Sequence, residues 1–173
     1  MYIPVNRYDI GTVEFKDGEI VVSDPGYQPH ERGNEDVKVK PGRYFAYAVY
    51  GEVPGWGERV IELCINHEST PKKKATSRIG FCFVDSGQCG FFEKADYEKY
   101  HPKGQITKES DEWYWKACRA TDSARRHHCG LVRSDKKVVG VLSTSGLGDG
   151  EYVLDAGYNT KNEITALRLR FFI

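Results

Sequence analysis

One segment of this chain indicates its fold class: Ser143-Thr144-Ser145-Gly146-Leu147-Gly148-Asp149-Gly150-Glu151-Tyr152. Three glycines within five residues, with an aspartate among them, are typical of a tight turn, because glycine adopts left-handed backbone conformations at little cost. The apolar segments on either side, residues 138–142 and 152–156, are rich in valine, leucine and tyrosine. The stretch therefore predicts two β-strands joined by a turn.

Similar strand-like segments, separated by turns rich in Gly, Pro and Asp, recur along the whole chain. They cover residues 12–15, 20–22, 37–39, 43–50, 59–65, 79–84, 89–92, 131–133, 138–142, 152–156 and 164–173. Asp17-Gly18 predicts a hairpin between the first two segments. The short turns after residue 130 predict a four-stranded meander.

One segment, residues 110–122, has a helical pattern. Ser110 is the expected N-cap, and the two acidic residues after it favour the positive end of the helix dipole. Trp113, Ala117 and Ala120 are spaced by four and three residues, so they should face the sheet. The pattern predicts one principal helix that covers an edge or an open end of the sheet.

Composition excludes several classes of protein. The 173 residues include 25 basic and 25 acidic side chains, so no net charge attracts the chain to nucleic acid or to an anionic membrane. No apolar run approaches the roughly 20 residues that a membrane helix needs. Five cysteines, an odd number without a C-x-x-C pair, and a start without a hydrophobic leader favour reduced thiols in the cytoplasm. We expect a soluble cytoplasmic protein without a cofactor.

Two cysteine-containing motifs resemble reactive or metal-binding sites, but neither has the residues or the geometry that such a site needs. Gln88-Cys89-Gly90 superficially resembles the segment near the nucleophile of papain-like proteases, but that family needs a further cysteine at the start of a helix, and here Phe91-Phe92 follow in a strand. His127-His128-Cys129 has zinc-ligand residue types, as has Cys118 before it, but neighbouring strand residues point to opposite faces. We expect no metal site, and we expect Arg125-Arg126 to follow the helix near its negative end.

Three acidic residues, Asp24, Asp85 and Asp149, occur at the predicted ends of strands. If these turns converged, their carboxylates could bind a divalent cation or act in acid–base catalysis, which makes Asp85 and Asp149 the candidate catalytic residues. Aspartate is also common in turns for a purely structural reason, since its side chain accepts a hydrogen bond from the backbone two residues later. Both interpretations stay open at this point.

Aromatic residues in loops and on the helix suggest a binding surface instead. Trp56 lies in a glycine-rich loop and Trp115 lies on the opposite side of the helix from Trp113. Tryptophan dominates the energetics of many protein interfaces, because it buries a large area at little cost in entropy. We expect Trp56, Trp115 and Asp24 to contact a protein partner, and the run Lys72-Lys73-Lys74 to be a solvated loop.

Several short motifs together resemble a known family. Val84-Asp85-Ser86-Gly87 and Gly148-Asp149-Gly150-Glu151-Tyr152, followed by an apolar C-terminal strand, are similar to the V-D-S-G and G-D-G-x-Y motifs of a widespread bacterial family of uncharacterised, strand-rich proteins. The resemblance implies a β architecture. That family has no established activity, so no catalytic residue is transferred from it.

These observations predict one domain over residues 1–173 that is mainly antiparallel β. The domain should be a two-layer sandwich or a strongly curved sheet with one principal helix near 110–122. Two functions remain open. The first is a binding protein, such as an inhibitor or an immunity-type protein that blocks a protein partner. The alternative is a hydrolase or small-ligand enzyme with its site at Asp24, Asp85 and Asp149.

Overall fold

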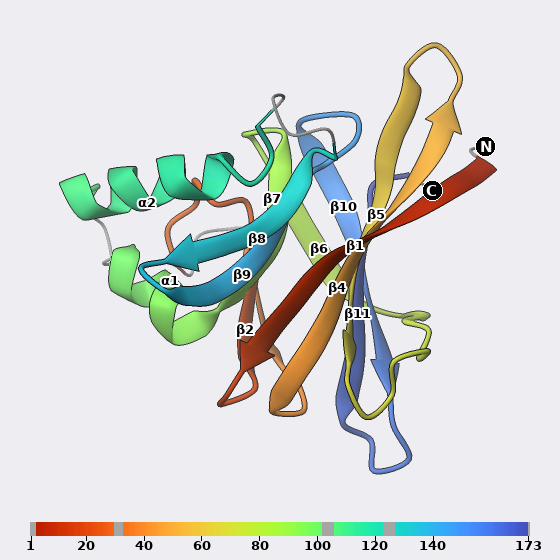
Figure 1. Cartoon of the computed structure of the whole chain (residues 1–173), viewed down its shortest axis with the longest axis horizontal. Coiled ribbons are helices and arrows are strands. Elements are labelled where there is room, and N and C mark those ends of the chain that lie inside the picture. Colours follow the sequence, from red (N-terminus) through yellow and green to blue (C-terminus); the bar gives the residue numbers. More distant parts are fainter. Residues whose placement is uncertain (1–2, 30–32, 102–105, 123–126, 173) are drawn as a thin grey trace.

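The computed structural model describes residues 3–29, 33–101, 106–122 and 127–172, and these form eleven β-strands and two α-helices (Figure 1). The larger sheet has the strand order β1 (Ile3–Phe15), β4 (Gly42–Val53), β5 (Gly57–His67), β11 (Ile164–Arg170), β10 (Gly150–Tyr158) and β6 (Ser77–Val84). The smaller sheet has the order β3 (Glu35–Lys38), β2 (Glu19–Ser23), β7 (Gln88–Glu93), β9 (Lys137–Thr144) and β8 (Cys129–Ser134). All strand pairs are antiparallel, and the predicted two-layer sandwich is confirmed.

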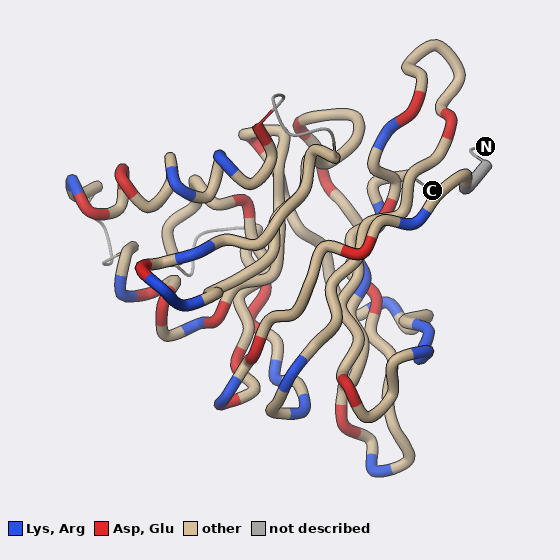
Figure 2. Tube along the Cα trace, viewed as in Figure 1, with Lys and Arg blue, Asp and Glu red and all other residues tan. Residues whose placement is uncertain are grey.

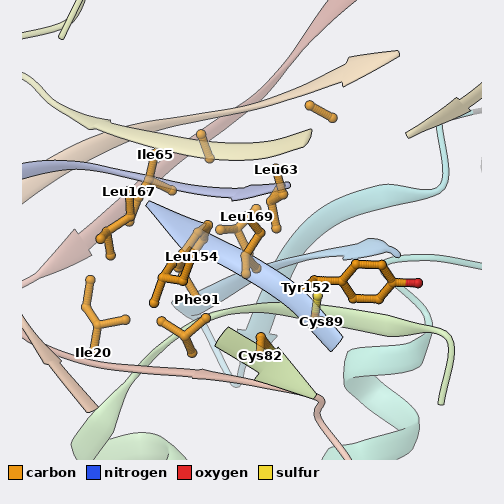
Figure 3. Close-up of a cluster of buried hydrophobic side chains, with 14 of the residues drawn as sticks. Ile20, Leu63, Ile65, Cys82, Cys89, Phe91, Tyr152, Leu154, Leu167 and Leu169 are labelled. Atoms are coloured by element: carbon orange, nitrogen blue, oxygen red, sulfur yellow. The ribbon is translucent and has the colours of Figure 1, made fainter. Parts of the chain in front are cut away.

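The main hydrophobic core lies between the two sheets. Leu63 and Leu154 of the larger sheet and Ile20 and Phe91 of the smaller sheet are completely buried in it. Figure 3 shows these four side chains converging from their strands. Leu167 and Leu169 of the last strand, β11, also enter this core.

The helices form a third layer on the outer face of the smaller sheet (Figure 1). Trp113 and Ala117 of α2 (Lys108–Cys118) and Tyr97 of α1 (Lys94–Tyr100) pack there against Phe92 and Leu142. The smaller sheet is therefore buried on both faces, which explains why every residue of β7 is buried. No helix in the described part of the chain is long and apolar enough to cross a membrane.

The principal helix begins earlier and ends earlier than the sequence predicts. Thr107 is the N-cap, and Ser110 is the third residue of a reciprocal capping box, in which each side chain bonds the other residue's backbone N–H. The helix ends at Cys118, and only turns follow up to Thr121. The short helix α1 was missed because its seven residues carry little apolar periodicity.

The predicted hairpin around Asp17-Gly18 is wrong in its pairing. The turn is present, with Gly18 at a φ of 68°, but β1 pairs with β4 and β2 pairs with β3 and β7. The turn therefore carries the chain from one sheet to the other. Both strands direct apolar side chains, such as Phe15 and Ile20, into the shared core, and this burial outweighs a local hairpin.

The predicted four-stranded meander is also wrong in part. β8 pairs with β9, and β10 pairs with β11, as expected. The glycine-rich turn between β9 and β10 crosses between the sheets, because β9 also pairs with β7 and β10 with β6. The glycine-rich stretch 143–152 thus carries the chain from the smaller sheet to the larger sheet.

Candidate functional site

The carboxylate of Asp24 lies at the centre of a cluster of turns. The side chain is 1% exposed, and it accepts four hydrogen bonds. One oxygen accepts from the backbone of Gly26 and from the Ser86 hydroxyl, both at 2.8 Å. The other oxygen accepts from the backbone N–H groups of Asp85 at 2.9 Å and Ser86 at 2.7 Å. Asp24 therefore ties the end of β2 to the turn between β6 and β7, and its burial removes it as a partner-binding residue.

The turn that contains Asp149 lies beside the turn that contains Asp85. The backbone N–H of Ser145 donates to the carbonyl of Gly87 at 2.9 Å, and a Cβ on Gly87 would lie 3.8 Å from the Cα of Gly148. The hydroxyl of Tyr152 donates to the carbonyl of Gly148 at 2.7 Å and holds the glycine turn in place. The three turns thus form one cluster, as the alternative function requires.

The carboxylates of this cluster do not form a metal site. Asp85 and Asp149 are exposed, whereas Asp24 is buried. Within the described ranges, no group of three or more His, Cys, Asp or Glu side chains could hold a metal ion. Burial, and to a lesser extent a hydrogen bond to Asp85, raises the pKa of Tyr27 to about 12. Asp85 and Asp149 remain candidates for acid–base work only.

The cysteine of the protease-like motif is buried. Cys89 is 0% exposed. Its burial, and to a lesser extent its contact with Cys82, raises the pKa of its thiol well above the ordinary value. A nucleophilic cysteine needs the opposite, a lowered pKa and access to substrate. In the structure, Cys89 is a core residue between the sheets (Figure 3).

The segment His127-His128-Cys129 packs against tyrosines of β1 and β4. The ring of His127 stacks on Tyr8, with centroids 3.7 Å apart. The Tyr50 hydroxyl donates to the backbone carbonyl of His127 and lies 3.4 Å from the Cys129 sulfur. His128 is exposed and has a φ of 47°. The predicted position of Arg125-Arg126 lies outside the described residues.

The two tryptophans predicted to bind a partner are exposed but far apart. Trp56 is 52% exposed at the tip of the β4–β5 hairpin, and Trp115 is 60% exposed on α2. Figure 1 shows this hairpin projecting beyond the sandwich on the side opposite α2. Trp113, in contrast, is 2% exposed and belongs to the core, as predicted. Trp56 and Trp115 therefore belong to two separate surfaces.

The tip of the hairpin has a defined shape. The strands stay paired up to Val53 and Gly57, and the N–H of Trp56 donates to the carbonyl of Val53 at 2.9 Å. Gly55 and Gly57 have φ values of 79° and 71°, which residues with a side chain rarely adopt. These glycines fix the turn that presents Trp56 to solvent.

A charged cluster on the outer face of the larger sheet escaped prediction. Arg168 and Arg170 donate to the buried carboxylate of Asp155 at 2.9 and 2.7 Å, and Arg168 also donates to Glu62 at 3.2 Å. Burial raises the pKa of Glu62, against the opposing charges of the two arginines. The only signal in the sequence is the spacing of Arg168 and Arg170, because residues two apart in a strand lie on the same face.

A pocket of about 360 Å³ lies where the two sheets meet at β1 and β8, beside the C-terminal end of α2. Tyr8 contributes an aromatic ring to its wall, and Lys116, Arg119 and Arg133 contribute positive charge. Figure 2 shows basic positions along this end of α2 and on β8. No sequence motif marks this pocket, because its residues come from three separate segments.

Comparison with known proteins gives no relative: no family model matches the chain, and neither a curated protein nor a solved structure matches it. The resemblance to a bacterial family of strand-rich proteins therefore stays a prediction.

Proposed function

We propose that this chain is a β-rich binding protein that docks on a protein partner through the tip of the β4–β5 hairpin, with Trp56 as the anchor. The observation that carries this proposal is the exposure of Trp56, 52%, on a hairpin that projects from the sandwich. A defined turn holds this large apolar side chain in water. Transfer of its apolar surface from water into a partner's pocket would stabilise the complex. An inhibitor or an immunity-type protein would use such a projecting anchor to block its target.

The residues around Trp56 suggest the chemistry of the partner. Glu52 and Glu58 lie opposite each other in the register of the hairpin, and both are exposed. Like charges directly opposite each other destabilise a strand pair. A basic partner surface would relieve this repulsion while an apolar pocket receives the indole ring. We therefore infer a partner with an apolar cleft flanked by lysine or arginine.

Affinity capture with matched variants tests the proposal. The wild-type chain, Trp56→Ala and Trp115→Ala are immobilised and exposed to lysate of the source organism, and a recovered partner is then purified and mixed with each chain. We expect wild type and Trp115→Ala to form a complex and Trp56→Ala to lose it. Both tryptophans are similarly exposed, so loss of apolar surface alone does not distinguish the variants. Equal binding by Trp56→Ala would exclude the hairpin tip as the anchor.

A second candidate function, a hydrolase or small-ligand enzyme, is supported by the convergence of the acidic turns. Its catalytic groups would be Asp85 and Asp149, which are both exposed, and not Asp24, whose oxygens are occupied by backbone and hydroxyl donors. This proposal requires an activity that Asp85→Asn and Asp149→Asn each remove without loss of folding.

A further inference from the structure

The pocket at the seam of the two sheets has the features of an anion site. The turn after α2 packs closely on β8 in its lining, where a Cβ on Gly130 would lie 3.0 Å from the carbonyl oxygen of Ala120. Its positive charges come from two elements, Lys116 and Arg119 at the end of α2 and Arg133 on β8. No carboxylate is among the described residues that line it.

The three cations have no ion-pair partner in the described part of the chain. Other basic residues that pack near acidic ones are paired, for example Lys137 with Asp96 at 2.7 Å. The natural partner of Lys116, four residues before it on α2, is Glu112, but the carboxylate of Glu112 lies 3.8 Å from the ammonium group of Lys108 instead. Because the whole chain has no net charge, three cations around one pocket are a local concentration of positive charge.

Favourable placement at the helix end explains only part of this arrangement. Lys116 lies in the last turn of α2 and Arg119 is its C-cap residue, where a positive charge suits the negative end of the helix dipole. Arg133 lies on β8, so the dipole gives no reason for its position. The convergence of Arg133 with the two helix residues on one cavity points to a ligand.

We propose that this pocket binds a phosphate group, either free or carried by a small organic molecule. A phosphate monoester carries between one and two negative charges at neutral pH, and arginine binds it through paired N–H donors. The volume of about 360 Å³ falls in the range of about 300–1,000 Å³ for small-molecule sites. The wall formed by Tyr8, stacked on His127, gives the organic part an apolar surface to contact. This inference does not depend on the hairpin tip or on a protein partner.

Calorimetric titration with inorganic phosphate and with ribose 5-phosphate tests the proposal, at near-physiological ionic strength and with ribose as the uncharged control. We expect saturable binding of one phosphate-bearing molecule per chain. Arg119→Gln and Arg133→Gln should each weaken binding about tenfold or more, the effect of losing a charged hydrogen bond. Arg43→Gln, an exposed arginine on β4 without an ion pair in the described residues, should leave the affinity unchanged.

The two probes also distinguish the source of the phosphate. Tighter binding of ribose 5-phosphate would assign the pocket to an organic phosphate, and equal affinities would assign it to the free ion. The proposal is overturned if neither probe binds saturably. It is also overturned if Arg43→Gln weakens binding as much as Arg133→Gln, because the attraction would then be diffuse. All three arginines are exposed, so the variants should fold.

Discussion

Asp24 and Ser86 lie 62 residues apart in the sequence, and Ser86 donates both its backbone N–H and its hydroxyl to the Asp24 carboxylate, at 2.7 and 2.8 Å. This contact joins the end of β2 in the smaller sheet to the turn that follows β6 in the larger sheet. A buried carboxylate without a cation is stable only when such donors replace its hydration. Asp24 therefore has a structural role: the bond from Gly26 is the one expected of an aspartate in a turn, whereas the contact with Ser86 leaves no local motif.

Replacement of this carboxylate should destabilise the fold. Asp24→Asn replaces one acceptor oxygen with an NH₂ group that faces backbone donors, so we expect a loss of about 2 to 3 kcal/mol in the free energy of unfolding. Asp149→Asn, at an exposed position in the neighbouring turn, should change it by less than about 0.5 kcal/mol. Urea unfolding of both variants measures the difference. Equal, small effects would show that the hydrogen bonds to Asp24 contribute little.

The two tryptophans of α2 should differ strongly in their contribution to stability. Trp113 is 2% exposed and Trp115 is 60% exposed. Trp113→Ala should lower the free energy of unfolding by about 3 to 5 kcal/mol, because it leaves a cavity between α2 and the smaller sheet. Trp115→Ala should have an effect within about 0.5 kcal/mol. Denaturant unfolding checks both values, and a large loss in Trp115→Ala would contradict the orientation of α2.

Only one of the five thiols should react readily in the native state. Cys118 is partly exposed, while Cys64, Cys82, Cys89 and Cys129 are buried. Burial also raises the pKa of Cys64 to about 12 and that of Cys129 above its ordinary value, which keeps them in the unreactive thiol form. Ellman's reagent should therefore titrate one thiol rapidly and the others only after unfolding. Cys118→Ser should abolish the rapid phase, and a persisting rapid phase would place another cysteine at the surface.

His101 should make the protein less stable in mild acid. It is 2% exposed, and burial lowers its pKa from the ordinary value of 6.5, although backbone carbonyls of Tyr97 and Pro25 oppose the shift. The unfolded chain then binds a proton more readily than the folded one. The stability that His101 contributes is complete above its unfolded pKa and is lost as pH falls towards the lower folded pKa.

Urea midpoints at pH values on either side of this window test the prediction. Carboxylates also lose stability in acid, so the informative quantity is the difference between wild type and His101→Gln. We expect the midpoint of His101→Gln to fall less on acidification than that of wild type. Identical shifts for the two chains would show that His101 does not contribute.

The elements of this fold are predictable from local sequence, but their pairing is not. The segments 79–84 and 152–156 are strands in both the prediction and the structure, because alternation and turn residues are local signals. The partner of each strand depends on which face is buried. Phe15 and Ile20 flank a good hairpin turn, and yet they enter the shared core from different sheets.

The candidate surfaces show the same limit. The exposure of Trp56 follows from its glycine-rich turn, so the sequence was sufficient to identify it. The burial of Asp24 depends on donors from the turn after β6, and the seam pocket depends on the meeting of Arg119 and Arg133 across two elements. Contacts between segments distant in sequence leave no motif, so these features required the structure.

Site-specific photo-crosslinking determines whether Trp56 contacts a protein partner. A benzophenone amino acid is introduced at position 56 in one chain and at position 115 in another, and both are irradiated with the partner recovered by capture. If Trp56 is the anchor, a covalent adduct forms from position 56 and none forms from position 115. An adduct from position 115 alone would exclude Trp56 as the anchor and would move the interface to α2.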